Sequence, residues 1–203
     1  ELTLYLAPGT CAMAVRIALV EAGAPHQIKR LDLAAGEQRT PAYLAINPKG
    51  RVPALVTERG VLTETPALLL YVAQRFPDAG LAPLDAPFLL ARMQEVHSFL
   101  ASTVHVSHAH GRRGSRWADD EHAIAAMKAR MPQNMREGFA EIEHHYLAGP
   151  WVLGEHFSLA DIYLFVVASW LESDGVTIDE FPKVADHTRR MLARPAVQQA
   201  LLL

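Results

Sequence analysis

The pattern of hydrophobic and polar positions changes period several times along the first 76 residues. The apolar run from Leu2 to Leu6 predicts a short buried strand, and from Cys11 apolar residues recur at helical spacing until Gly23 ends the helix. Further predicted elements are a strand at 27–33, a short helix at 41–46, two strands on either side of Gly60, and a helix at 65–76. Two parallel strands joined by a helix, followed by an antiparallel hairpin, predict a small mixed sheet in an α/β domain.

The rest of the chain has a different pattern. The stretch 77–87 is rich in proline, glycine and alanine, which is typical of a linker, and helical spacing dominates after it. Predicted helices lie at 88–109, in two pieces separated or kinked at Pro132, and at 158–172, 182–193 and 195–202. We therefore expect an α/β domain at 1–78, a linker at 79–87 and an all-helical domain at 88–203.

Composition narrows the possible classes of function. The 203 residues are 50% hydrophobic and 20% charged, with a formal net charge of −3, which is ordinary for a globular protein. A chain without a basic excess is not expected to bind nucleic acid, and no apolar run is long enough to cross a membrane. One cysteine cannot form an internal disulfide, so we expect a reducing compartment, the cytoplasm.

That cysteine, Cys11, follows a strand and a turn and opens a helix. Free N–H groups and the positive end of the helix dipole stabilise a thiolate, so its pKa is expected to fall from about 8.5 toward neutrality. No second cysteine follows in the Cys-x-x-Cys position, which excludes a disulfide cycle within one chain but allows a mixed disulfide with a small thiol. The alternative is a small, half-buried core residue.

Val52-Pro53 follows a turn and precedes a predicted strand. If this peptide bond is cis, the backbone N–H and C=O of Val52 face outward and can pair with an extended peptide. If it is trans, the commoner form, Pro53 merely begins a strand. The residues themselves leave both possibilities open.

Glu64-Thr65-Pro66 begins a predicted helix, with Thr65 at the N-cap and Pro66 at the first helical position. The N–H groups of such a helix start can bind a carboxylate, and the side chain of Glu64 can bind an ammonium group. The pair would suit the α-amino-acid end of a ligand, although capping alone also explains it.

Two other motifs are not expected to take part in catalysis or to bind a metal ion. Ser158 and Asp161 form a capping box, with Phe157 packing on Ile162, and we assign them no catalytic role. Histidines occur at 105, 108 and 110, but no carboxylate or cysteine completes a tight cluster, so no metal site is expected. We expect His105 to line a substrate cleft instead.

Taken together, the motifs make the chain similar to glutathione transferases, and most of all to their bacterial beta class. The resemblance covers nearly the whole chain and rests on four segments: Ala7-Pro8-Gly9-Thr10-Cys11, Asn47 to Leu55 (NPKGRVPAL), Thr63-Glu64-Thr65, and Phe157 to Asp161 (FSLAD). It implies the cytosolic glutathione transferase architecture, with a thioredoxin-like N-terminal domain and an all-helical C-terminal domain that supplies the co-substrate pocket. It also implies a homodimer, a role in detoxification, and glutathione as co-substrate without a further cofactor.

The resemblance also implies roles for individual residues. Cys11 matches the cysteine close to the glutathione sulfur, Val52 the backbone partner of its cysteinyl moiety, and Pro53 the family's cis-proline. Glu64 and Thr65 match the pair that holds the γ-glutamyl end. In the helical domain, His105 matches a histidine in the cleft, and Ser98 stands where the beta class usually has an asparagine.

Several positions depart from the family pattern. Leu6 occupies the strand-one tyrosine position, with Tyr5 facing the opposite side, and Ala12 replaces a frequent serine. The lysine often used for the glycyl carboxylate is missing near Ala35-Gly36, and Val106 replaces a lysine after the cleft histidine. The cations or donors that could replace the missing lysine are Gln38, Arg39 and Arg51.

Three hypotheses follow for the function. The first is a glutathione transferase, in which glutathione thiolate attacks a small hydrophobic electrophile. The second is a thiol–disulfide oxidoreductase that uses Cys11 and glutathione. The third is a non-enzymatic protein of the same fold that binds hydrophobic ligands, a possibility that the lost hydroxyl and lysine side chains keep open.

Overall fold

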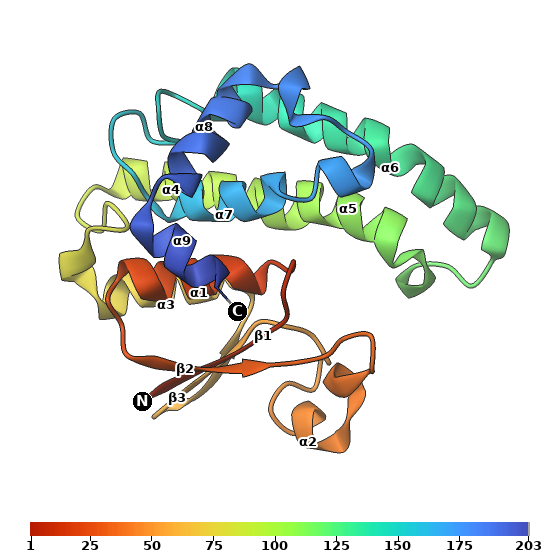
Figure 1. Ribbon diagram of the computed structural model, residues 1–203, viewed down its shortest axis with the longest axis horizontal. Helices are drawn as coiled ribbons and strands as arrows, with labels where there is room; N and C mark the ends of the chain where they lie inside the picture. The colour runs from red at the N-terminus through yellow and green to blue at the C-terminus, as the bar shows by residue number, and fades with distance from the viewer. Residues whose placement is uncertain (203) are drawn as a thin grey trace. The chain divides into compact units, whose positions relative to one another are not determined.

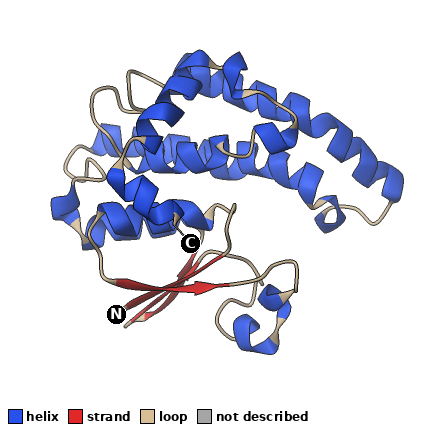
Figure 2. Ribbon diagram, viewed as in Figure 1, coloured by secondary structure: helices blue, strands red, loops and turns tan. Residues whose placement is uncertain are grey.

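The computed structural model describes residues 1–202, which form two compact units (Figure 1). The first unit comprises residues 1–90 with 192–202, and the second comprises Ala91–Met191. The named strands all belong to the first unit, whereas the second consists of helices and loops (Figure 2). The predicted pairing of an α/β domain with an all-helical domain is confirmed.

The sheet of the first unit has the order β2-β1-β3-β4. Its strands are β1 (Leu2–Leu6), β2 (His26–Arg30), β3 (Ala54–Thr57) and β4 (Gly60–Thr63). β1 and β2 are parallel, while β3 is antiparallel to both β1 and β4, as the predicted mixed sheet requires. Leu2, Leu4 and Leu6 are buried and the residues between them are only half-buried, so β1 turns one apolar face to the core.

Four helices accompany this sheet: α1 (Ala12–Glu21), α2 (Pro41–Leu44), α3 (Thr65–Arg75) and α9 (Pro195–Leu201). α1 contacts β1, α3 and α9. The helices α1, α3 and α9 lie on one side of the sheet in Figure 1. The predicted end of α1 at Gly23 is confirmed. Gly23 has a φ of 60°, its N–H donates to Val20, and the N–H of Ala24 donates to Leu19, which are the two bonds of a Schellman motif.

The structure groups the chain differently from the predicted division at residue 88. The last helix, α9, packs on α1, and Arg194 just before it forms a two-pronged ion pair with Glu21 of α1 (2.6 and 3.0 Å). This pair and the apolar contact of α9 join residues 192 onward to the first unit. Residues 79–87, expected as a linker, also belong to that unit.

The second unit contains α5 (His105–Arg112), α6 (Glu121–Glu141) and α7 (Leu159–Ala168), together with α4 (Pro87–Phe99) from Ala91 onward and α8 (Pro182–Leu192) up to Met191. A π-helical segment, Leu100–Val104, joins α4 to α5, so the predicted long helix is present with a widened turn inside it. α6 is one helix, not two pieces, because Pro132 removes one N–H from its ladder without ending it. All ten residues of α7 are buried, as expected for the centre of a core.

A buried polar network fixes α7 within this unit. The capping box of Ser158 and Asp161 is present as predicted. Asp161 is fully buried and also accepts hydrogen bonds from the Val152 N–H (2.8 Å) and from Nε2 of His187 (2.9 Å). A buried carboxylate with several donors is well compensated for the loss of water, so this aspartate has a structural role.

No helix within residues 1–202 combines the length and the apolar character needed to span a bilayer.

Candidate functional site

The strand register brings three loop segments to one end of the sheet. Ala54, the first residue of β3, pairs with Tyr5 near the end of β1 and with Thr63 at the end of β4. Because β3 is antiparallel to both neighbours, the residues that precede β3 lie beside those that follow β1 and β4. The turn before Cys11, the Val52-Pro53 turn and the start of α3 at Glu64 therefore meet at this end. We call it the candidate site.

Cys11 lies at the start of α1, as predicted, with helical dihedral angles (φ −58°, ψ −17°). The residue is 8% exposed, and its thiol donates a weak hydrogen bond to the Val52 carbonyl oxygen at 3.9 Å. The N–H groups of Met13 and Ala14 donate to carbonyl oxygens of the turn itself. A carbonyl neighbour favours the protonated thiol and the helix dipole favours the thiolate, so activation of this thiol stays a prediction.

The Val52-Pro53 bond is cis, which decides the question that the residues left open. Two buried side chains hold the preceding carbonyl: the Tyr43 hydroxyl and the Asn47 amide both donate to the Arg51 oxygen, at 2.6 and 2.7 Å. Burial raises the pKa of Tyr43, so its hydroxyl remains a donor over a wide pH range. Sequence reasoning missed the roles of Tyr43 and Asn47, and the only signal was Asn47 at the head of the NPKG turn.

Glu64 and Thr65 stand at the start of α3, but the predicted cap is wrong by one residue. Glu64, not Thr65, is the N-cap, and Thr65 is the first residue of the helix and is buried. Glu64 has a positive φ (73°), which is uncommon for a residue other than glycine, and it stands between the end of β4 and the first residue of the helix.

The carboxylate of Glu64 is largely exposed and forms an ion pair with Lys49. Nζ of Lys49 also donates to Oγ1 of Thr63 at 2.7 Å. Glu64 was expected to bind an ammonium group, and in this structure it binds the ammonium group of Lys49. Sequence reasoning did not identify Lys49, since nothing in the chain pattern links positions 49 and 64.

The three candidates to replace the missing lysine differ in their surroundings. The side chain of Arg39 lies close to the turn at Gly50. A Cβ atom added to Gly50 would be 3.2 Å from Nη1 of Arg39. Arg51 is exposed, and its backbone carbonyl is the one held by Tyr43 and Asn47. The amide nitrogen of Gln38 donates to the Leu33 oxygen (3.4 Å), and its amide oxygen is buried without a hydrogen-bond partner in the described part of the chain.

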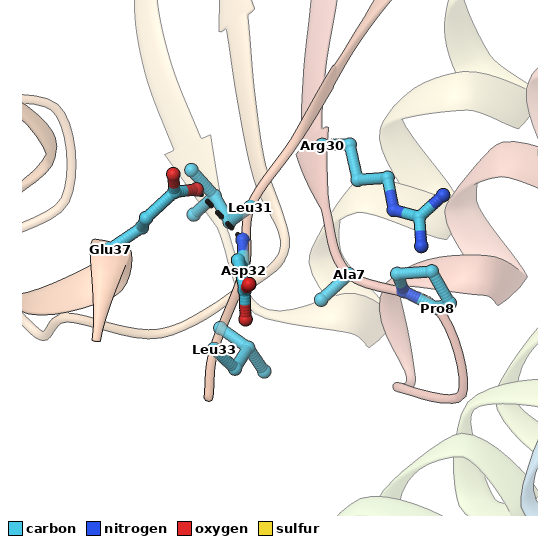
Figure 3. Close-up of a pocket in the computed structure, with 7 residues that line it drawn as sticks. All are labelled: Ala7, Pro8, Arg30, Leu31, Asp32, Leu33 and Glu37. Carbon is cyan, nitrogen blue, oxygen red and sulfur yellow. Dashed lines mark hydrogen bonds between the residues drawn. The ribbon is translucent and has the colours of Figure 1, made fainter. Parts of the chain in front are cut away.

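A cavity of about 500 Å³ adjoins the turn that leads to Cys11 (Figure 3). Its lining residues are Ala7, Pro8, Arg30, Leu31, Asp32, Leu33 and Glu37. Both acidic side chains serve the loop: Asp32 accepts two backbone N–H groups of the following turn (2.9 and 3.0 Å), and Glu37 accepts the N–H of Asp32 (2.7 Å). Figure 3 shows the side chain of Arg30 extended, with its guanidinium next to Pro8.

Ser98 and His105 belong to the second unit, and their predicted place in a co-substrate cleft stays a prediction. Ser98 is exposed on α4, and the ring of His105 lies 4.8 Å from that of Trp170. The π-helical segment between them changes their angular offset from that of a regular helix.

A neighbouring histidine, His108, for which no role was predicted, has a charged and an aromatic partner. Nδ1 of His108 lies 2.6 Å from the fully buried carboxylate of Asp174, and its ring stacks on Trp170 at 4.4 Å. Arg112 approaches the same carboxylate at 3.2 Å. Among residues 1–202 there is no group of three or more His, Cys, Asp or Glu placed to bind a metal ion.

Two family models match the chain. "Glutathione S-transferase, N-terminal domain" matches residues 1–74, and "Glutathione S-transferase, C-terminal domain" matches residues 124–190.

Similar proteins agree with these matches. A crystal structure of a glutathione transferase homolog from Sulfitobacter with bound glutathione is 50% identical, covers 98% of this chain and 96% of that chain, and has a TM-score of 0.96. A bacterial beta class glutathione S-transferase from Sphingomonas chungbukensis is 33% identical over 98% of this chain and 96% of that one, with a TM-score of 0.85. Maleylacetoacetate isomerase from Pseudomonas aeruginosa is 32% identical over 94% of this chain and 91% of its own length.

Proposed function

Because the chain belongs to the glutathione S-transferase family of enzymes, we propose that it binds glutathione at the candidate site and transfers it to small hydrophobic electrophiles. The observation that carries this proposal is the convergence of Cys11, the cis Val52-Pro53 turn and Glu64 at one end of the sheet. The 50% identical Sulfitobacter homolog was crystallised with bound glutathione, which supports the same ligand here.

Each part of glutathione finds a chemical partner in this arrangement. The cysteinyl moiety is extended and can pair with the backbone of Val52, which lies just outside the paired part of β3. The γ-glutamyl end carries an ammonium and a carboxylate, which suit the Glu64 side chain and the N-terminal N–H groups of α3. Its sulfur would then lie toward Cys11, whose thiol already contacts Val52. For the glycyl carboxylate we propose Arg39 or Arg51.

The reaction needs little from the protein beyond position and charge. Glutathione loses its thiol proton to water, the thiolate sulfur forms a bond with an electrophilic carbon, and a leaving group such as chloride departs with the electrons of the broken bond. Holding the thiolate close to the electrophile lowers the entropic part of the barrier. Donors that stabilise the thiolate at neutral pH increase the reactive fraction.

Binding of glutathione at Glu64 can be tested with a matched pair of carboxylate variants. Glu64→Gln removes the charge that faces the ammonium, and Glu58→Gln removes another surface carboxylate, which pairs with Arg75 instead. Titration calorimetry should show glutathione affinity lowered about tenfold to hundredfold in Glu64→Gln, because a hydrogen bond to a charged group contributes about 1.5–3 kcal/mol. Equal losses in both variants would refute the assignment of Glu64.

A second candidate, thiol–disulfide exchange through Cys11, is favoured by the placement of that thiol at the candidate site. The Cys11 thiolate would attack a disulfide, release one thiolate and form a mixed disulfide. Glutathione thiolate would then break it, and a second glutathione would complete the conversion to oxidised glutathione and free Cys11. If the Cys11→Ala variant still conjugates a chloronitrobenzene but no longer reduces disulfides, the protein has a Cys11-dependent thiol–disulfide exchange activity.

An isomerase reaction is a third candidate, since one relative is named maleylacetoacetate isomerase. The same thiolate attack leads to isomerisation when the adduct expels the sulfur again instead of another group. Chromatography of the products separates the two reactions, because isomerisation regenerates glutathione and transfer consumes it.

We also propose that the enzyme works in the cytoplasm as a homodimer and contributes to detoxification. The edge strand β4 exposes Val61 and Leu62 (40% each), and Phe88 at the start of α4 is 80% exposed, so the first unit offers apolar surface for a partner copy. Sedimentation velocity should give twice the chain mass, and Phe88→Ser should shift the protein toward the monomer.

A further inference from the structure

The ion pair between Lys49 and Glu64 occupies the group that we propose for the ligand's ammonium. Nζ of Lys49 contacts the Glu64 carboxylate and donates to Oγ1 of Thr63 at 2.7 Å. A lysine ammonium and the α-ammonium of glutathione present the same charge and the same three donors. Two ammonium groups on one carboxylate repel each other, so Lys49 and the ligand's ammonium compete for Glu64.

The local backbone allows Lys49 to move while the rest of the turn stays in place. The N–H of Lys49 donates to the side chain of Asn47 at 3.2 Å, and Asn47 is buried. The side chains of Lys49 and Glu64 are 45% and 69% exposed, and exposed ion pairs of this kind are weak. Opening the pair therefore requires only rotation of the Lys49 side chain into water.

We propose that Lys49 is an internal competitor of glutathione that sets the affinity of the site for the ligand's ammonium, an inference that rests on the proposed function. Lys49 is a positioning residue, not a catalytic one. An exposed pair that is closed about half to five-sixths of the time weakens the apparent affinity about twofold to sixfold. Removing the lysine should tighten glutathione binding by this factor. If Lys49 instead made a favourable contact with glutathione, removing it would weaken binding.

The test compares three lysine variants by titration calorimetry with glutathione. Lys49→Met keeps the length of the side chain without its charge, Lys49→Arg keeps the charge, and Lys29→Met removes an exposed cation from β2 as the matched control. We expect Kd to fall about twofold to sixfold in Lys49→Met, and to stay equal or rise in the other two. KM for glutathione should follow Kd, whereas kcat should not change.

Two further measurements show whether the gain passes through Glu64. In a Glu64→Gln background, Lys49→Met should have no effect, because the double-mutant cycle then contains no pair to remove. A glutathione analogue whose α-amino group is replaced by hydrogen should bind Lys49→Met no better than the wild type. An equal gain for this analogue, or weaker glutathione binding in Lys49→Met, would overturn the proposal.

The outcomes separate this inference from the proposed function. If the wild-type protein does not bind glutathione at all, both the proposed function and the inferred competition by Lys49 are wrong. If it binds glutathione and Lys49→Met binds it equally well, only the inference about Lys49 fails.

Discussion

Replacement of His97 should change how the stability of the second unit depends on pH. His97 is fully buried on α4, its ring packs edge-on against Tyr163, and neither ring nitrogen has a hydrogen-bond partner within the described residues. Burial lowers the pKa of His97 from 6.5 to about 4. The side chain is therefore neutral in the folded protein at pH 7.

The sign of the effect follows from proton binding. Below pH 6.5 the unfolded chain binds a proton at His97, whereas the folded protein does not until about pH 4. Stability is therefore complete above pH 6.5 and is lost as the pH falls toward 4. Each pH unit in this window costs about 1.4 kcal/mol, so the loss is about 2 kcal/mol at pH 5 and about 3 kcal/mol at pH 4.

The variant His97→Leu removes this titration while keeping a similar volume. Urea unfolding at pH 7.5 and pH 5 can be followed by tryptophan fluorescence, because all three tryptophans lie in the second unit. The wild-type free energy of unfolding should fall by about 2 kcal/mol more than that of the variant, since other titrating groups act equally on both. Parallel losses in the two proteins would refute the reasoning.

Three further substitutions test other parts of the structure. Asp161→Asn should cost about 3–5 kcal/mol of unfolding free energy, because an amide turns N–H groups toward the buried donors of the capping network; an unchanged urea midpoint would contradict this. Gly111→Ala should cost about 1–3 kcal/mol, since the new Cβ would lie 2.0 Å from Sδ of Met131, and Met131→Ala should restore part of the loss. Asn47→Ala should weaken glutathione binding about tenfold in calorimetry by removing one of the two donors that hold the Arg51 carbonyl, with the fold intact by circular dichroism.

Local patterns predicted those elements whose causes are close in sequence. The capping box at Ser158 and Asp161, the end of α1 at Gly23 and the strand β1 all appear as expected. The partner of Asp161 could not be predicted, because His187 lies 26 residues away and reaches it only in the folded core.

The candidate site shows the same limit. Segments with recognisable motifs were expected to form it, and the register of β3 with β1 and β4 brings them together. The helix α3 begins at Thr65 as predicted, but its N-cap was assigned one residue too late, because nothing in the residues announces the positive φ of Glu64. Lys49 was missed because its contact depends on how two turns meet, and the grouping of α9 with the first unit depends on the pair of Arg194 with Glu21.

The central claim is that glutathione lies across Val52 with its sulfur toward Cys11, and a crystal structure with bound glutathione tests it most directly. We expect the cysteinyl N–H and C=O to pair with the backbone of Val52, the α-ammonium to contact Glu64 in place of Lys49, and the sulfur to lie next to the Cys11 thiol. Glutathione bound instead in the cavity beside Arg30, away from Val52 and Glu64, would contradict the account.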